Sequence, residues 1–326
     1  MSTHSAMASF TIDEILSDEW AKIERGIGAR PQLTGDALDM RLQYRELAEQ
    51  MNASAPVTPG VSVVDEHITE HLTVRVYKPM DRKEALPVGL YFHGGGFCCG
   101  DLDSEDPFCR ILVERQRCVI VSVGYRLAPE HKAPAQTEDA MTAWNWSVQN
   151  ASLLGGDPSR YFTIGQSAGG NLALATAHLL IDQGRRSEIN GVVALVPLAI
   201  HPKNVPFHHK DNHRSYHECA DGPVNTADAM ATFLESVEAR EDDPSVFVLL
   251  SQHLHQFPPT YIAVCEVDPL RDDGILVGCA LREAGVPVKL DHYRGLPHVF
   301  WAFGCPSPSG DFIGDVMAGV DFVLKS

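Results

Sequence analysis

The chain has 326 residues, which is enough for one large α/β domain with a core of its own. Its 43 acidic residues outnumber its 26 Lys and Arg residues, giving a formal net charge of −17, so neither nucleic acid nor an anionic membrane is an expected partner. No uninterrupted apolar run approaches the ~20 residues that cross a bilayer, and the first ten residues lack a secretion signal, so we expect a cytoplasmic protein.

Residues 1–55 predict helices before any strand appears. Thr11 and Glu14 have the spacing of a capping box, and apolar residues recur at helical spacing through Ile23. A second helix is predicted from about Thr34. Two helices in this position favour an N-terminal cap segment that lies across a later site. The alternative is a helical arm that packs on the domain or on a second subunit, so a homodimer is compatible with the sequence.

Residues 56–326 predict a single domain in which strands alternate with helices. The predicted strands are Val61–Val64, Leu72–Tyr77, Val88–Phe92, Val119–Val123, Tyr161–Ile164, Val192–Val196, Tyr261–Val264 and Val286–Tyr293. The predicted helices are one near Asp139–Gln149, one from Ala168, one over Thr226–Ala239 and one over Phe312–Leu324. Continuous Val and Ile runs suit strands buried on both faces, hence a mainly parallel sheet between helices. Residues of about 200–240 interrupt this alternation and predict an insertion that adds to the cap.

Ser167 lies in a Gly-x-Ser-x-Gly string between an apolar strand and an alanine-rich helical stretch. Gly165 and Gly169 remove the side chains that would collide where a strand turns sharply into a helix. The context predicts a nucleophile elbow, with the serine hydroxyl exposed above a helix N-terminus.

A run of three glycines follows His93 at the end of the predicted strand Val88–Phe92. Bare backbone N–H groups in such a run suit a developing oxyanion. A phosphate-binding loop would need a lysine after the glycines, and none follows.

A carboxylate and a histidine after two late strands complete the pattern. Asp268 follows the strand Tyr261–Val264 and is the predicted partner that orients a histidine; its rivals in the same stretch are Glu266, Asp272 and Asp273. His298 follows the last strand and precedes the last helix. The chain order Ser, Asp, His, with each residue at a strand end, predicts a catalytic triad.

On these residues the sequence resembles the hormone-sensitive-lipase-like family of α/β-hydrolase carboxylesterases from about residue 61 to the C-terminus. The segments that carry the resemblance are His93–Phe97, Tyr125–Glu130, Leu154–Arg160, Gly165–Asn171, Asp268–Asp272 and Gly295–Phe300. The resemblance implies an α/β-hydrolase fold with a helical cap, no cofactor, and oxyanion amides on Gly94, Gly95 and Ala168. Phe97 and Val299 are further expected to contact the substrate.

The sequence departs from the family pattern at two positions. Gln166 stands where the family usually has Asp before the serine, and Gly124 stands where Asp usually precedes Tyr125 and Arg126. Neither position is in the triad, so the departures affect local hydrogen bonding and pocket polarity rather than the expected reaction.

Histidines at 209, 213 and 217, with His208, Asp211 and Cys219 nearby, form a rival constellation that could hold a metal on a helix. Prolines at 202 and 206 favour a loop instead, and the resemblance implies no metal there. We therefore expect a solvated cap surface and no metal site.

The predicted activity is hydrolysis of small-molecule carboxylic esters, with short acyl chains, through an acyl-enzyme on Ser167. His298 would act as the base and Asp268 would orient it. A lyase or cyclase acting on a biosynthetic intermediate in the same pocket is the main alternative. A non-catalytic small-molecule receptor is a further one, against which the presence of His298 counts.

Overall fold

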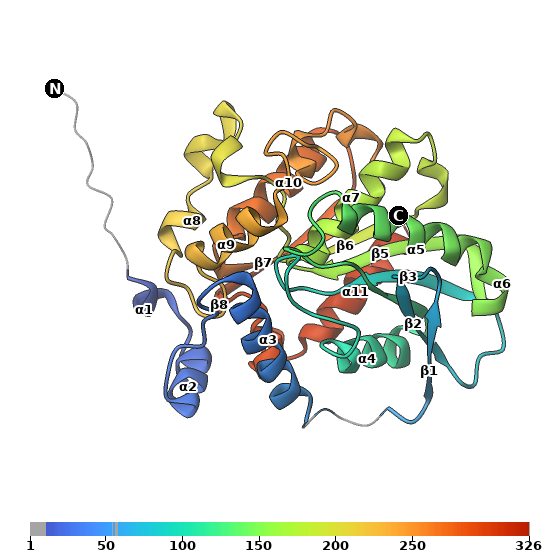
Figure 1. Cartoon of the computed structure of the whole chain (residues 1–326), viewed down its shortest axis with the longest axis horizontal. Coiled ribbons are helices and arrows are strands. Elements are labelled where there is room, and N and C mark those ends of the chain that lie inside the picture. The colour runs from blue at the N-terminus through green and yellow to red at the C-terminus, as the bar shows by residue number, and fades with distance from the viewer. Residues whose placement is uncertain (1–10, 54, 56–57, 326) are drawn as a thin grey trace.

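The computed structural model describes residues 11–53, 55 and 58–325, which form one eight-stranded sheet between two layers of helices (Figure 1). The strand order is β1-β2-β4-β3-β5-β6-β7-β8; β1 and β2 pair antiparallel, as do β2 and β4, and all other pairs are parallel. The strands are β1 Val61–His67, β2 Thr73–Pro79, β3 Leu86–Phe92, β4 Val119–Gly124, β5 Gly156–Gln166, β6 Gly191–Leu195, β7 Thr260–Val267 and β8 Val288–Pro297. The predicted mostly parallel α/β-hydrolase sheet is confirmed, and each predicted strand is present with somewhat different ends.

Helices cover both faces of the sheet. They are α1 Ile12–Ile15, α2 Asp18–Ile27, α3 Ala37–Asn52, α4 Asp106–Gln116, α5 Ala135–Gln149, α6 Ala151–Leu154, α7 Ala168–Asp182, α8 Ser215–Glu218, α9 Ala227–Val237, α10 Arg271–Glu283 and α11 Phe312–Lys325. The side chains of α5, α7 and α10 pack into one apolar core, and those of α4 and α11 pack into a second core on the other face. Because central strands such as β3 are buried along their whole length, they carry the continuous apolar runs seen in the sequence.

The N-terminal helices and the insertion after β6 come together although they lie far apart in the chain. Helix α3 contacts α9, and Gln32 forms a β-bridge with Val224 (Figure 1). Arg41 of α3 also reaches the sheet domain, where it donates to the carbonyl of Ala128 and pairs with Glu130.

The predicted helices differ from the structure in one split helix and in helices that were missed. The single helix expected from Thr11 is two helices: α1 ends at Ile15, and Ser17 donates its N–H to the carbonyl of Gly295 at 2.8 Å and caps α2. Helices α4 and α10 were not predicted. In α10 the glycines hid the pattern, since Gly274 and Gly278 lower helix propensity while allowing close packing on the sheet. A Cβ on Gly274 would lie 2.4 Å from the side chain of Val264.

Candidate active site

Ser167 occupies a sharp turn between β5 and α7. Its backbone has φ +55° and ψ −120°, a conformation that non-glycine residues rarely adopt. The turn is so tight that a Cβ on Gly169 would lie 1.9 Å from the carbonyl oxygen of Phe92, and one on Gly165 would lie 2.3 Å from that of Gly169. These two glycines therefore permit the strand-to-helix turn that presents Ser167.

His298 and Asp268 form a buried pair at the ends of β8 and β7. His298 Nδ1 lies 2.6 Å from Asp268 Oδ2, with the histidine side chain 7 % exposed and the aspartate fully buried. The second oxygen of Asp268 accepts from the N–H of Leu270 at 2.9 Å and from Asn225 of the insertion at 3.4 Å. These bonds hold the carboxylate in place. Because Asp268 pairs with Nδ1, Nε2 of His298 is the nitrogen that is available to accept a proton.

The three rival carboxylates have other partners. Glu266 accepts from the N–H of Gly295 at 2.7 Å. Asp272 accepts from the N–H groups of Arg214 and Ser215 at the start of α8. Asp273 accepts from the N–H groups of Ala199 and Ile200 and from His213. The structure thus places only Asp268, among these four, against His298.

In the predicted oxyanion loop, the N–H of Gly94 donates to Oε1 of Glu105 at 2.9 Å, so this amide has an acceptor in the folded chain. Gly95 and Gly96 both have positive φ, +109° and +60°, and form the turn that follows. Ala168 is the first residue of α7, where a backbone N–H has no partner within the helix.

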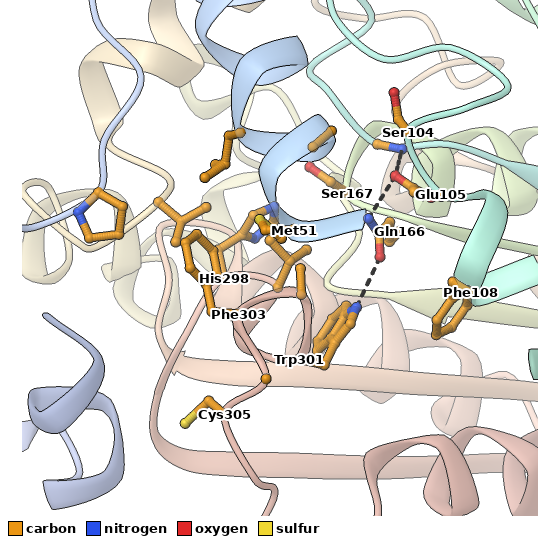
Figure 2. A pocket seen from close by; sticks show the side chains of 18 of the residues that line it. Met51, Ser104, Glu105, Phe108, Gln166, Ser167, His298, Trp301, Phe303 and Cys305 are labelled. Carbon is orange, nitrogen blue, oxygen red and sulfur yellow. Dashed lines mark hydrogen bonds between the residues drawn. The ribbon is translucent and has the colours of Figure 1, made fainter. Parts of the chain in front are cut away.

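Two cavities of very different size meet at Ser167. The larger, about 1140 Å³, is lined by Ser167, His298 and Val299 and by apolar residues of α2, α3 and the segment after β8 (Figure 2). The smaller, about 10 Å³, has room for about one water molecule. It is lined by Gly96, Phe97, Ser167, Ala168, Leu198, Met230, Phe233 and Leu234. Of the two expected substrate contacts, Phe97 thus lines the small cavity and Val299 the large one.

Sequence reasoning missed a partly buried carboxylate beside the elbow. Glu105 accepts a hydrogen bond from Gln166 Nε2 at 2.7 Å, and Gln166 Oε1 accepts one from Trp301 Nε1 at 3.1 Å (Figure 2). Burial raises the pKa of Glu105 above its usual value, although its hydrogen bonds act in the opposite direction. Glu105 lies in the acidic stretch 101–106, whose composition is typical of a solvated surface. The only sequence feature that pointed to an unusual partner near the elbow was Gln166 in place of the family's Asp.

The histidine cluster of the insertion does not form a metal site. Among the residues that the structure describes, no three His, Cys, Asp or Glu side chains form a group that could hold a metal ion. The expected solvated surface is wrong for His213, whose side chain is 4 % exposed and lies 2.8 Å from Asp273. His213 instead ties the insertion to α10.

In the same described part of the chain, no helix is long and apolar enough to span a membrane.

Comparison with known proteins agrees with the fold. A family model for the alpha/beta hydrolase fold matches residues 89–302. A versiconal hemiacetal acetate esterase from Dothistroma septosporum is 36% identical over 312 residues, covering 95% of each chain. A protein of the same name from Aspergillus parasiticus is 38% identical over 290 residues, covering 87% of this chain and 90% of the other. The solved structure of vibralactone cyclase superposes with a TM-score of 0.87 at 27% identity, covering 98% of this chain and 96% of the other.

Proposed function

The chain belongs to the hormone-sensitive-lipase-like carboxylesterases of the α/β-hydrolase fold and is a carboxylesterase, and from this premise we propose that Ser167, His298 and Asp268 are its catalytic triad. The observation that carries the proposal is the buried His298–Asp268 pair, 2.6 Å apart, beside the cavity that Ser167 also lines.

The proposed reaction proceeds through an acyl-enzyme. His298 Nε2 takes the proton from Ser167 as its oxygen attacks the ester carbonyl, then gives that proton to the leaving alcohol. Water, deprotonated by the same nitrogen, then attacks the acyl-enzyme, and the nitrogen returns that proton to the Ser167 oxygen as the acid is released. Asp268 holds the imidazole in one tautomer and stabilises its charged form. No cofactor takes part in these steps.

We assign the oxyanion to the amides of Gly95, Gly96 and Ala168. Gly96 and Ala168 line the small cavity together with Ser167, and Gly95, which lines the large cavity, directly precedes Gly96. Gly94 is left out because Glu105 accepts its N–H. Gly96 takes its place as the third glycine of the run, next to Gly95, and both have positive φ.

The two cavities support an assignment of the two halves of the ester. The small cavity suits a short acyl group such as acetyl, because Phe233 and Met230 of α9 limit its depth. The large cavity, about 1140 Å³, suits a bulky apolar alcohol, since drug-sized pockets measure ~300–1,000 Å³. Two relatives are named for an acetate ester, which is consistent with this assignment.

A cyclase or lyase reaction is the second candidate, and the likeness to vibralactone cyclase favours it. The same serine and histidine would act on an intermediate without net hydrolysis. Mass spectrometry of the products separates the two reactions. Free acid and alcohol support hydrolysis, whereas loss of water or acetate with a new ring or double bond supports the alternative.

A panel of p-nitrophenyl esters of graded acyl length, run beside Ser167→Ala, tests the proposal. We expect the parent protein to cleave acetate best, and Ser167→Ala to lose nearly all turnover and all labelling by a fluorophosphonate while keeping its unfolding temperature. Full labelling of the Ala variant at another serine would show that the nucleophile is wrongly assigned.

A further inference from the structure

We propose that Glu105 is a positioning residue for the ester hydrolysis proposed above, on which this inference rests: its carboxylate holds the oxyanion loop, the nucleophile elbow and the histidine loop in one arrangement. Glu105 is the residue just before α4; it lines the large cavity but not the small cavity where the carbonyl is expected to react. It would act on the reacting carbonyl through its neighbours.

The carboxylate of Glu105 receives hydrogen bonds from four separate parts of the chain. Oε1 accepts from the N–H of Gly94 at 2.9 Å, from Gln166 Nε2 at 2.7 Å and from the hydroxyl of Tyr44 at 3.2 Å. Oε2 accepts from the hydroxyl of Tyr91. The donors belong to the oxyanion loop, the elbow, the N-terminal helix α3 and strand β3. One partly buried side chain therefore links four segments that meet at the site.

Gln166 extends this connection to the loop that carries His298. An indole N–H can only donate, so the side-chain oxygen of Gln166 faces Trp301. The NH₂ group of Gln166 then faces Glu105 and donates to it. Trp301 lies three residues after His298, in the short helix Phe300–Phe303. A continuous chain of hydrogen bonds thus runs from Gly94 through Glu105 and Gln166 to Trp301 (Figure 2).

This chain of hydrogen bonds gives a physical reason for Gln at position 166. An aspartate there would face the partly buried Glu105 carboxylate, and two carboxylates at that distance repel each other, which disfavours the ionisation of both. Glutamine instead donates to Glu105 and accepts from Trp301. Within the described residues no Lys or Arg pairs with Glu105, so neutral donors alone stabilise its charge. Glu105 and Gln166 are therefore matched to each other.

The expected effect is on kcat rather than on KM. The Gly94 amide precedes Gly95 and Gly96 in the backbone, and the oxyanion develops only as the ester carbonyl is attacked, not in the bound ground state. Loss of one oxyanion donor costs ~10²–10³ in kcat. Glu105→Leu leaves the four donors without an acceptor, so we expect a loss of about 10²-fold in kcat with KM changed by less than about threefold.

Glu105→Gln is the conservative variant. Its amide oxygen can still accept from Gly94 and Gln166, while its NH₂ group can donate to the Tyr91 oxygen. We expect it to keep kcat within about tenfold of the parent value, because it preserves the geometry without the charge.

Asp106→Leu is the matched control. Asp106 is the next residue of α4 and also accepts from a buried tyrosine, Tyr77, at 2.8 Å. Its removal disturbs the same helix start, but Asp106 contacts Tyr77, Arg75 and Arg110 rather than Gly94 or Gln166. We expect a lower unfolding temperature with kcat within about threefold of the parent.

The experiment measures kcat and KM on p-nitrophenyl acetate for the parent, these three variants, Gln166→Leu and the double variant with Glu105→Leu. If the two residues act as one unit, the double variant is scarcely worse than the poorer single one. A parent-like kcat in Glu105→Leu, a loss in Glu105→Gln equal to that in Glu105→Leu, or an equal loss in Asp106→Leu each overturns the inference. If Glu105→Leu does not fold, a parent-like kcat in Gln166→Leu overturns it. An inactive parent protein instead refutes the proposed function.

Discussion

Phe233 closes the small cavity beside Ser167, and its removal should lengthen the acyl chain that the enzyme accepts. The residue lies on α9 and is 5 % exposed, with its ring against the oxyanion loop: a Cβ on Gly96 would lie 2.2 Å from that ring. In the parent protein the cavity of about 10 Å³ leaves room for little beyond an acetyl methyl group. Phe233→Ala should open this space.

The size of the effect follows from the methylenes that the opened space can bury. Butyrate has two more methylenes than acetate, and burying both is worth about 1.6 kcal/mol. That corresponds to about a 15-fold rise in the butyrate-to-acetate ratio of kcat/KM. The assay is hydrolysis of p-nitrophenyl acetate, butyrate and hexanoate by the parent and the variant.

Phe303→Ala is the matched control, because Phe303 lines the large cavity and packs on Trp20 at the other end of the site. It should leave the acyl-chain ratio unchanged and lower kcat/KM for acetates of bulky alcohols relative to methyl acetate. Removing a buried Phe costs ~3–5 kcal/mol of stability, so Phe233→Leu serves if Phe233→Ala unfolds. An unchanged butyrate-to-acetate ratio in a folded variant would refute the assignment of the small cavity to the acyl group.

Three further changes test the pair at the site and the attachment of the N-terminal helices. His298→Ala should lose turnover by about 10⁴-fold or more while binding a non-hydrolysable ester analogue almost unchanged, and equal losses in both would argue against a base. Asp268→Asn should lower kcat by about 10⁴-fold through the wrong tautomer, whereas Glu266→Gln should not. The Arg41 guanidinium lowers the pKa of Glu130 from its usual value near 4.5 to about 2, so this pair stabilises the fold above pH 4.5 and loses its contribution as the pH falls toward 2. The difference in unfolding temperature between the parent and Arg41→Met should therefore be smaller at pH 3 than at pH 5, and a constant difference would contradict the ion pair.

Local patterns in the sequence were sufficient for the sheet and for the elbow. Buried strands need continuous apolar runs, and the turn at Ser167 needs glycine at 165 and 169, so both leave a signal within a few residues. The carboxyl ends of parallel strands meet at one edge of a sheet, which is why Asp268 and His298 could be proposed together although 30 residues separate them.

Tertiary structure decided what depends on contacts between distant segments. Four carboxylates near β7 look alike in the sequence, and only the start of α10 turns Asp272 and Asp273 toward the insertion while Asp268 faces His298. The direction of one amide, that of Gly94, depends on Glu105 eleven residues later. The volume on each side of Ser167 depends on side chains of α3, α9 and the segment after β8, which meet only in the folded chain. Steric limits and hydrophobic periodicity depend on neighbouring residues in the chain, so the sequence shows them directly. The partner of a buried polar group depends on which surfaces pack together in the folded protein.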